Sequence, residues 1–297
     1  MAGVLTTDHP AWHSYDGARA RAVRAGSGLW VMSHDSHGLR VDCVDGNEDV
    51  KPSFVVTDPA DLPAAAPTAL RDGLGGLGIT QRLANPWLWD AITTAILRQV
   101  VRADQARKLY RTWCSTYGST VDGPFGPLAV APTHTRVLEL AESSFAAVGA
   151  KFHRTTLQAA AEHYDRHHGT WQHLEAGDLV VAPTSIPRVG PWTARAAAAD
   201  FTGDFSIYPH DDLAVRTWAS YLAPSYPWPD KKDKSFGPLW TGWAGEDRTA
   251  LHTLTLATLT WGGARSMTWR THAAVTAARR RQQHPHARRL VHQRTAA

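Results

Sequence analysis

Hydrophobic and polar positions follow two different rhythms along the chain. Between residues 12 and 58, short apolar runs are broken by Gly, Asp and His, as is typical of strands joined by turns. The predicted strands are Gly17–Arg24, Leu29–Ser33, Leu39–Val44 and Phe54–Thr57. We expect these strands to form a small antiparallel sheet.

From Asn85-Pro86 onward, apolar residues recur at the spacing of helices. Asn can cap a helix and Pro suits its first turn, so we expect the first helix to begin there. Further helices are predicted over residues 103–117, 135–148, 152–167, 191–201, 213–222 and 246–260, with an irregular loop over 225–242. The fold class is therefore mainly α, with a small N-terminal antiparallel β-sheet, and α+β overall.

The same pattern divides the chain into four regions. Residues 1–60 form a β-rich region, and residues 61–84, rich in Pro and Gly, form a linker with a short helix near residues 68–72. Residues 85–275 form the helical core. Residues 276–297 are polar and basic, which predicts a disordered tail.

Composition narrows the class of protein. The net charge is +4 over 297 residues, and part of the excess lies in the tail at Arg279-Arg280-Arg281, so charge is weak evidence for a polyanionic partner. Cys43 and Cys114 show no CxxC spacing and cannot supply the four thiolates of an iron–sulfur cluster. Without an apolar run of membrane-spanning length or a signal-peptide layout, we expect a reduced, cytoplasmic protein.

Residues 185–199 predict a tight turn that leads into a helix. Pro187 suits the turn, Gly190 can adopt the positive φ that such a turn needs, and Pro191 suits the first turn of a helix. Backbone N–H groups at such a junction bind anions such as a DNA phosphate, although an ordinary turn between helices fits equally well. The alanines that follow would let this helix pack closely on a neighbour.

An acidic helix start follows about twenty residues later, at Tyr208-Pro209-His210-Asp211-Asp212-Leu213. Either aspartate could cap the helix, and the helix dipole favours a negative charge there. A cap carboxylate is also held rigidly, so capping and chemistry are compatible.

Together these segments resemble the helix-hairpin-helix (HhH-GPD) DNA glycosylase superfamily. Residues 89–106 are similar to its first core helix, its wedge turn and its next helix, and residues 145–149 fall where the family expects them. The resemblance covers about residues 80–265 and is closest to the bacterial 3-methyladenine DNA glycosylase II type.

The resemblance implies one essential aspartate at the helix start. We favour Asp212 over Asp211 because Asp212 is followed by Leu213 and then Val215. A fixed carboxylate there would stabilise the positive charge that develops on the sugar as the N-glycosidic bond breaks.

The hairpin itself would hold the DNA backbone. Its predicted residues are Pro187, Arg188, Val189, Gly190 and Thr193. The family usually has Gly where Arg188 stands, so we expect Arg188 to fit the turn without a positive φ and to be free to add a phosphate contact.

The resemblance also outlines a base pocket. Trp192 stands where strand-cutting members carry a Lys, which implies a monofunctional enzyme without AP-lyase activity. Trp192 and Trp261 would each stack on an extruded, alkylated purine, or else pack in the core. Ala196 replaces a tyrosine and implies a wider pocket.

The turn at Gln99 and Val100 would supply the wedge that fills the hole left by the extruded base, although a buried valine is equally compatible. His210 would touch DNA or tune the site, or else be a plain surface residue.

No metal is expected, because His163, His167 and His168 do not complete a zinc signature. No cofactor is required either, while the hairpin type implies a structural monovalent cation on backbone carbonyls. The expected partner is double-stranded DNA containing a damaged base, with no membrane, for a monomeric protein associated with the nucleoid.

The leading hypothesis is therefore a monofunctional glycosylase that excises damaged, in the first place alkylated, purines in base excision repair. Two alternatives stay open. One is a glycosylase for oxidised or bulky natural-product adducts, and the other is a non-catalytic DNA-binding module whose hairpin only grips phosphate.

Overall fold

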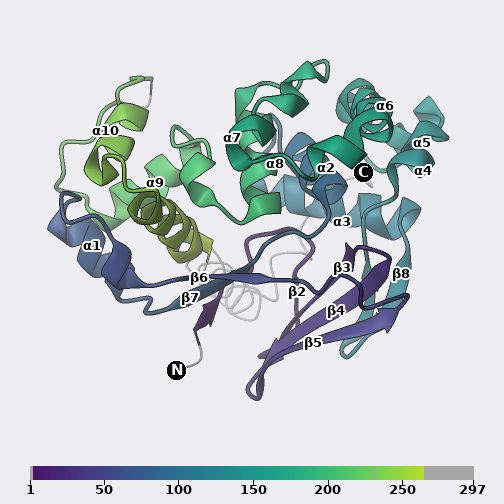
Figure 1. Cartoon of the computed structure of the whole chain (residues 1–297), viewed down its shortest axis with the longest axis horizontal. Coiled ribbons are helices and arrows are strands. Elements are labelled where there is room, and N and C mark those ends of the chain that lie inside the picture. Colours follow the sequence, from purple (N-terminus) through teal and green to yellow (C-terminus); the bar gives the residue numbers. More distant parts are fainter. Residues whose placement is uncertain (1–2, 231, 264–297) are drawn as a thin grey trace, which may run out of the picture.

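A computed structural model describes residues 3–230 and 232–263 of the chain (Figure 1). The predicted tail, 276–297, and the end of the predicted helical core lie outside these residues. In the view of Figure 1 most helices fill the upper part, and strands β3, β4 and β5 lie at the lower right. Within the described ranges, no helix combines the length and the apolar character needed to cross a bilayer.

The elements have the following bounds. The strands are β1 (Val4–Leu5), β2 (His13–Ser14), β3 (Arg19–Ala25), β4 (Gly28–Asp35), β5 (Gly38–Asp45), β6 (Phe54–Thr57), β7 (Thr80–Leu83), β8 (Thr120–Gly123) and β9 (Gly126–Ala129). The helices are α1 (Thr68–Gly75), α2 (Leu88–Leu97), α3 (Ala103–Tyr117), α4 (His134–Leu138), α5 (Glu142–Ala147), α6 (Arg154–Trp171), α7 (Ala176–Leu179), α8 (Pro191–Thr202), α9 (Leu213–Leu222) and α10 (Phe236–Ala244). A further helix covers residues 248–263 of the described chain.

Strands β2, β3, β4 and β5 form an antiparallel sheet in sequence order, which confirms the small N-terminal antiparallel sheet. The predicted strand Phe54–Thr57 does not belong to it, because β6 pairs with β7 in a separate sheet. The central hairpin of the four-stranded sheet turns through Gly26 and Ser27, and Gly26 has the positive φ, +54°, that two-residue hairpin loops need. Trp12, Trp30 and Met32 are almost fully buried on one face of this sheet, so a small core of its own stabilises it.

The sequence analysis missed strand β7, with its two pairings, and the hairpin of β8 and β9. β7 lies in the predicted linker and pairs with β6 on one side and, in parallel, with β1 on the other. Its polar residue Arg82 hid it, because that side chain points into a buried cluster of charges rather than to solvent. The β8–β9 hairpin interrupts the predicted helical core, between Gly123 and Gly126.

The predicted helices need three corrections. The first helix begins at Leu88 and not at Asn85-Pro86. The Asn85 side chain accepts from the Trp87 N–H, before the helix starts, and its amide nitrogen donates to the carboxylates of Asp90 and Asp200. The predicted helix over 135–148 is two short helices, α4 and α5. The predicted irregular loop 225–242 contains most of α10, whose buried Phe236 and Trp240 pack into the core.

Helices α2 and α8 form the centre of the helical layer and pack on each other more extensively than any other two labelled helices. Every residue of α2 is buried, and the alanines of α8 allow the close approach that the sequence suggested. The two helices run antiparallel, since Asp90 in the first turn of α2 lies near Asp200 at the end of α8. Their opposite ends therefore also meet.

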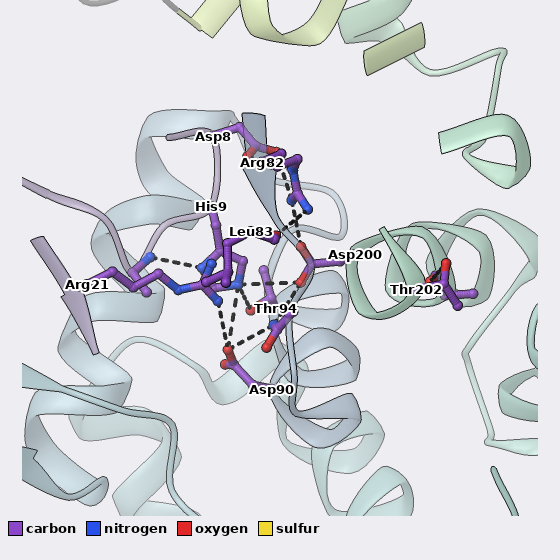
Figure 2. A network of polar contacts seen from close by, with 12 residues as sticks. Asp8, His9, Arg21, Arg82, Leu83, Asp90, Thr94, Asp200 and Thr202 are labelled. Carbon is purple, nitrogen blue, oxygen red and sulfur yellow. Dashed lines mark hydrogen bonds and ion pairs between the residues drawn. The ribbon is translucent and has the colours of Figure 1, made fainter. Parts of the chain in front are cut away.

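A buried network of charges joins the N-terminal segment to these two helices, as Figure 2 shows. The Asp200 carboxylate accepts hydrogen bonds from Arg82 at 2.6 Å and from Asn85 at 2.8 Å, and it lies 3.6 Å from His9. The Arg82 guanidinium forms a second, bidentate pair with Asp8 at 3.0 and 3.1 Å. Each guanidinium in this network lies beside a carboxylate of opposite charge, as burial of charges requires.

Three more residues extend the network across α2 and α3. Asp90 accepts from Tyr110 at 2.7 Å and lies 3.5 Å from Arg21, yet burial raises the pKa of this carboxyl. Burial, together with Arg21 and Arg82, lowers the pKa of His9 well below its usual value, so this imidazole is neutral.

Contacts between the two ends of the described chain close the fold. The Thr6 hydroxyl hydrogen-bonds the Thr260 hydroxyl at 2.9 Å, and both residues are buried. Strand β1 and the last helix are thereby in direct contact.

The network predicts a large loss of stability when Asp200 is removed. Asp200→Ala leaves the Arg82 and Asn85 donors partly unpaired in the core, so the free energy of unfolding should fall by about 3–5 kcal/mol in urea denaturation. The control is Asp165→Ala, whose carboxylate is 54% exposed beside His134 and should matter by less than about 1 kcal/mol. Equal effects of the two substitutions would contradict the assignment.

Candidate functional site

The hairpin lies at the N-terminal end of α8, and its backbone differs from the expectation. The positive φ, +68°, falls on Arg188, whereas Gly190 has φ −88° and is extended. Both predictions on this point were therefore wrong. The turn is closed by the Val189 N–H, which donates to the Ile186 carbonyl at 3.0 Å. Pro187 and Arg188 are its two central residues, and the second of them takes the left-handed conformation, as in a type II turn.

The side chains of this turn divide into two groups. Pro187 and Arg188 are exposed, while Val189 is buried. A guanidinium therefore stands in solvent beside the N-terminus of a helix, where it can meet a phosphate.

The turn between α2 and α3 carries the predicted wedge. Val100 is 89% exposed and has φ +61°, a conformation that is strongly disfavoured for a β-branched residue. The alternative of a buried valine is therefore wrong. Holding such a conformation costs on the order of 1–3 kcal/mol, which the surrounding structure must supply.

Gln99 braces the wedge turn against the hairpin. Its side-chain amide donates to the Thr193 hydroxyl at 2.8 Å and to the Arg188 carbonyl at 3.2 Å. Thr193 is only 3% exposed. Gln99 thus joins the two predicted DNA-contacting turns, and the exposed tip is left to Val100.

The two aspartates at the start of α9 have different partners. Asp212 occupies the N-cap position, but its carboxylate makes no cap bond and instead accepts the Tyr208 hydroxyl at 2.5 Å. The Asp211 carboxylate accepts from the Gly237 N–H at 2.8 Å and pairs with Arg216 at 3.2 Å. Arg216 also donates to the Asp230 and Asp233 carbonyls in the loop between α9 and α10, so Asp211 helps to fasten that loop to α9.

Two residues that the sequence analysis did not single out connect Asp212 to Trp192. The Arg98 guanidinium lies 5.8 Å from the centre of the Trp192 ring, and it faces the Tyr208 hydroxyl and the Asp212 carboxylate. Arg98 is a charged residue at the end of a helix that is otherwise fully buried, and this position was the signal that could have pointed to it. Trp192, Arg98, Tyr208 and Asp212 thus form one continuous chain of contacts next to the wedge turn.

Two further residues predicted for the base pocket are Trp261, which lies away from Trp192, and Ala196, which is buried. Trp261 packs edge-on against Trp218 of α9, at 6.3 Å between ring centres, rather than in the chain of contacts around Trp192. Ala196 is 5% exposed.

His210 is 9% exposed, so it is not a plain surface residue. Burial and the nearby Arg195 lower the pKa of His210 to about 4, which keeps the imidazole neutral near pH 7.

Metal ligands do not gather in the part of the chain that the structure describes. Within residues 3–230 and 232–263, no three His, Cys, Asp or Glu side chains lie together as metal ligands would. At the hairpin, the carbonyls of Ile186 and Arg188 accept hydrogen bonds from Val189 and Gln99. A monovalent cation on the hairpin carbonyls stays a prediction.

The sequence matches no protein-family model and no curated protein. Solved structures, in contrast, share its architecture. A 3-methyladenine DNA glycosylase from Archaeoglobus fulgidus aligns with a TM-score of 0.63 at 15% identity, over 86% of this chain and 89% of that one. An 8-oxoguanine glycosylase/lyase from Clostridium acetobutylicum, in complex with double-stranded DNA, aligns with a TM-score of 0.61 at 13% identity, over 86% and 88%.

A third structure, MBOgg1 in complex with a low affinity DNA ligand, aligns with a TM-score of 0.62 at 14% identity, over 86% of this chain and 88% of that one. At identities this low, the TM-scores show a shared architecture alone. The chain has the α+β fold of the helix-hairpin-helix DNA glycosylases.

Proposed function

We propose that this protein is a DNA glycosylase that extrudes a damaged purine from duplex DNA and hydrolyses its N-glycosidic bond. One observation carries the proposal. The carboxylate of Asp212 and the ring of Trp192 are linked through Arg98 and Tyr208, directly beside an exposed, strained apolar tip at Val100. A base pocket, a charge for the sugar and a wedge would thus lie together, as base extrusion requires.

Binding would begin with the phosphates of the duplex. Arg188 is exposed at the N-terminal end of α8, and Arg102, with a side chain 83% exposed, follows the wedge turn. Such contacts hold the duplex without reading its sequence and weaken as salt rises.

Chemistry would then fall to Asp212. As the bond to the base breaks, the sugar gains oxocarbenium character, and a carboxylate fixed nearby stabilises that positive charge. The same carboxylate can orient the water that attacks the sugar. The products are the free base and an abasic site.

Trp192 supports a monofunctional reaction. Because an indole cannot form a Schiff base with the sugar, this position offers no route to strand cleavage. We therefore propose release of the base without AP-lyase activity.

Trp192 also bears on the substrate. Its aromatic face would stack on an extruded purine, and alkylated purines that carry a positive charge bind such faces well. Damaged, alkylated purines are accordingly the first candidate substrates.

A second candidate substrate class is favoured by Arg98. Its guanidinium already lies over the Trp192 ring, and a cationic base on the same ring would be repelled by this charge. Neutral lesions, including oxidised and bulky adducts, avoid that repulsion. Single-lesion duplexes carrying 7-methylguanine, 8-oxoguanine or 1,N6-ethenoadenine separate the two classes by which base is released.

Substitution of the two aspartates tests the catalytic assignment. Asp212→Asn keeps the size of the side chain but removes its charge, so base release should slow by about 10²- to 10⁴-fold while DNA affinity is kept. Asp211→Asn is the matched control, because it mainly weakens the fastening to Gly237 and Arg216.

Release is followed on a single-lesion duplex, with alkali needed to cut the strand at the abasic product. If Asp211→Asn abolishes release and Asp212→Asn does not, the roles of the two residues are exchanged. If the wild-type protein binds damaged duplex but releases no base, it is a binding module.

Replacing Val100 by Gly tests the wedge. Gly accepts a positive φ, so the free energy of unfolding should stay the same or rise by about 1 kcal/mol. Base release from duplex DNA should fall, whereas release from single-stranded DNA, which leaves no hole to fill, should not. Val56→Ala, at a residue 61% exposed on β6, should change neither. Full activity of Val100→Gly on duplex DNA would exclude Val100 as the wedge.

A further inference from the structure

Between Trp192 and Asp212 lies a pair of polar residues that neither binds DNA from the surface nor belongs to the main buried network. Arg98 follows the last turn of α2, and Tyr208 follows a short 3₁₀ turn before α9. Tyr208 is only 2% exposed, and its ring stacks on Phe205 at 5.5 Å between centres. The Tyr208 hydroxyl donates to the carboxylate of Asp212, and Arg98 lies near enough to both residues for them to raise its pKa.

The protonation states of this pair are fixed. Burial, and then the charge of Asp212, raises the pKa of Tyr208 far above its usual value, so the phenol always has a proton to donate. Burial alone would lower the pKa of Arg98, but Tyr208 and Asp212 outweigh it and the net shift is upward. The Arg98 guanidinium, the neutral Tyr208 phenol and the Asp212 carboxylate therefore lie one after another.

The geometry leaves one carboxylate oxygen for chemistry. The Tyr208 hydroxyl donates to Oδ2 of Asp212 at 2.5 Å, which fixes the side-chain rotamer at a helix start where no backbone cap bond does so. Hydrogen bonds to an ionised carboxylate are strong. Because the Tyr208 bond fixes the rotamer, the direction of the second oxygen, Oδ1, is fixed as well. Displacement of a reacting group by 1 Å can lower a rate by about 10²-fold, so such fixing matters.

We propose that Tyr208 and Arg98 are positioning residues that hold the Asp212 carboxylate in one orientation, aimed at the sugar. The inference rests on the proposed function, since it assigns the reacting charge to Asp212. Arg98 acts through Tyr208 by orienting its hydroxyl, and Tyr208 acts through Asp212. Neither residue needs to touch the substrate for this role.

Tyr208→Phe tests the proposal with little risk to the fold, because the ring that stacks on Phe205 is kept. Single-turnover release of a base from a single-lesion duplex should slow by about 10- to 100-fold. Affinity for the same duplex should stay within about twofold of the wild-type value, because the bound DNA does not contact the phenol. The profile of single-turnover rate against protein concentration should therefore lose height while its midpoint stays in place, which loss of folded protein or of DNA binding would not produce.

Tyr117→Phe is the matched control. The Tyr117 hydroxyl donates to the Ser144 carbonyl at 2.8 Å, away from the site, and its removal should change neither the rate nor the profile. Arg98→Gln is the second variant. Because Arg98 acts through Tyr208, it should add little further loss of rate to Tyr208→Phe in the double variant.

Three results would overturn the proposal. In the first, Tyr208→Phe keeps the wild-type rate and profile while Asp212→Asn loses activity, which leaves the proposed function standing. In the second, Tyr208→Phe and Tyr117→Phe lose activity equally. In the third, the wild-type protein releases no base from any lesion duplex, and the proposed function then fails with it.

Discussion

The cluster of buried charges around Asp200 is the constraint on which the rest of the structure depends. Three carboxylates and two guanidiniums are withdrawn from water there, and each would be costly without its partners. Satisfying them requires the segment around Asp8, strand β7 and helices α2 and α8 to meet in one arrangement. Apolar packing alone would tolerate small slips between these elements, whereas directional pairs between charges do not.

The consequences appear at the other end of the same two helices. Because α2 and α8 are antiparallel, holding Asp90 near Asp200 at one end also sets the positions of two turns at the other end. These are the wedge turn, which begins at Arg98, and the hairpin, which leads to Thr193. Gln99 joins those turns directly. Val100 and Arg188 lie in these two turns, and both have a positive φ although neither is glycine. The helices that flank the turns, α2 and α8, are held at both of their ends. Strain of this kind persists only where the surroundings determine the backbone fully.

The sequence predicted those parts of the fold that local signals specify. Helix α9 has the predicted bounds, Leu213–Leu222, because an acidic start and a clear helical period mark it. Strand β7 was missed because Arg82 points inward to distant carboxylates that no local pattern can announce. The positive φ of Arg188 was missed for a related reason, since the preference of a residue type gives no sign of a turn imposed by hydrogen bonds around it. Arg98 and Tyr208 meet only after folding, so their pairing could not be read from their spacing.

The hydrogen bond between Thr6 and Thr260 has a consequence for how this protein is made. It joins the residue after β1 to the last described helix, whereas β1 itself pairs with β7, and Asp8 pairs with Arg82, much earlier in the chain. Contacts of long sequence separation form late and slowly. During synthesis, β1 and Asp8 can therefore find their partners once β7 has emerged, whereas Thr6 can meet Thr260 only when nearly all of the described chain has been translated.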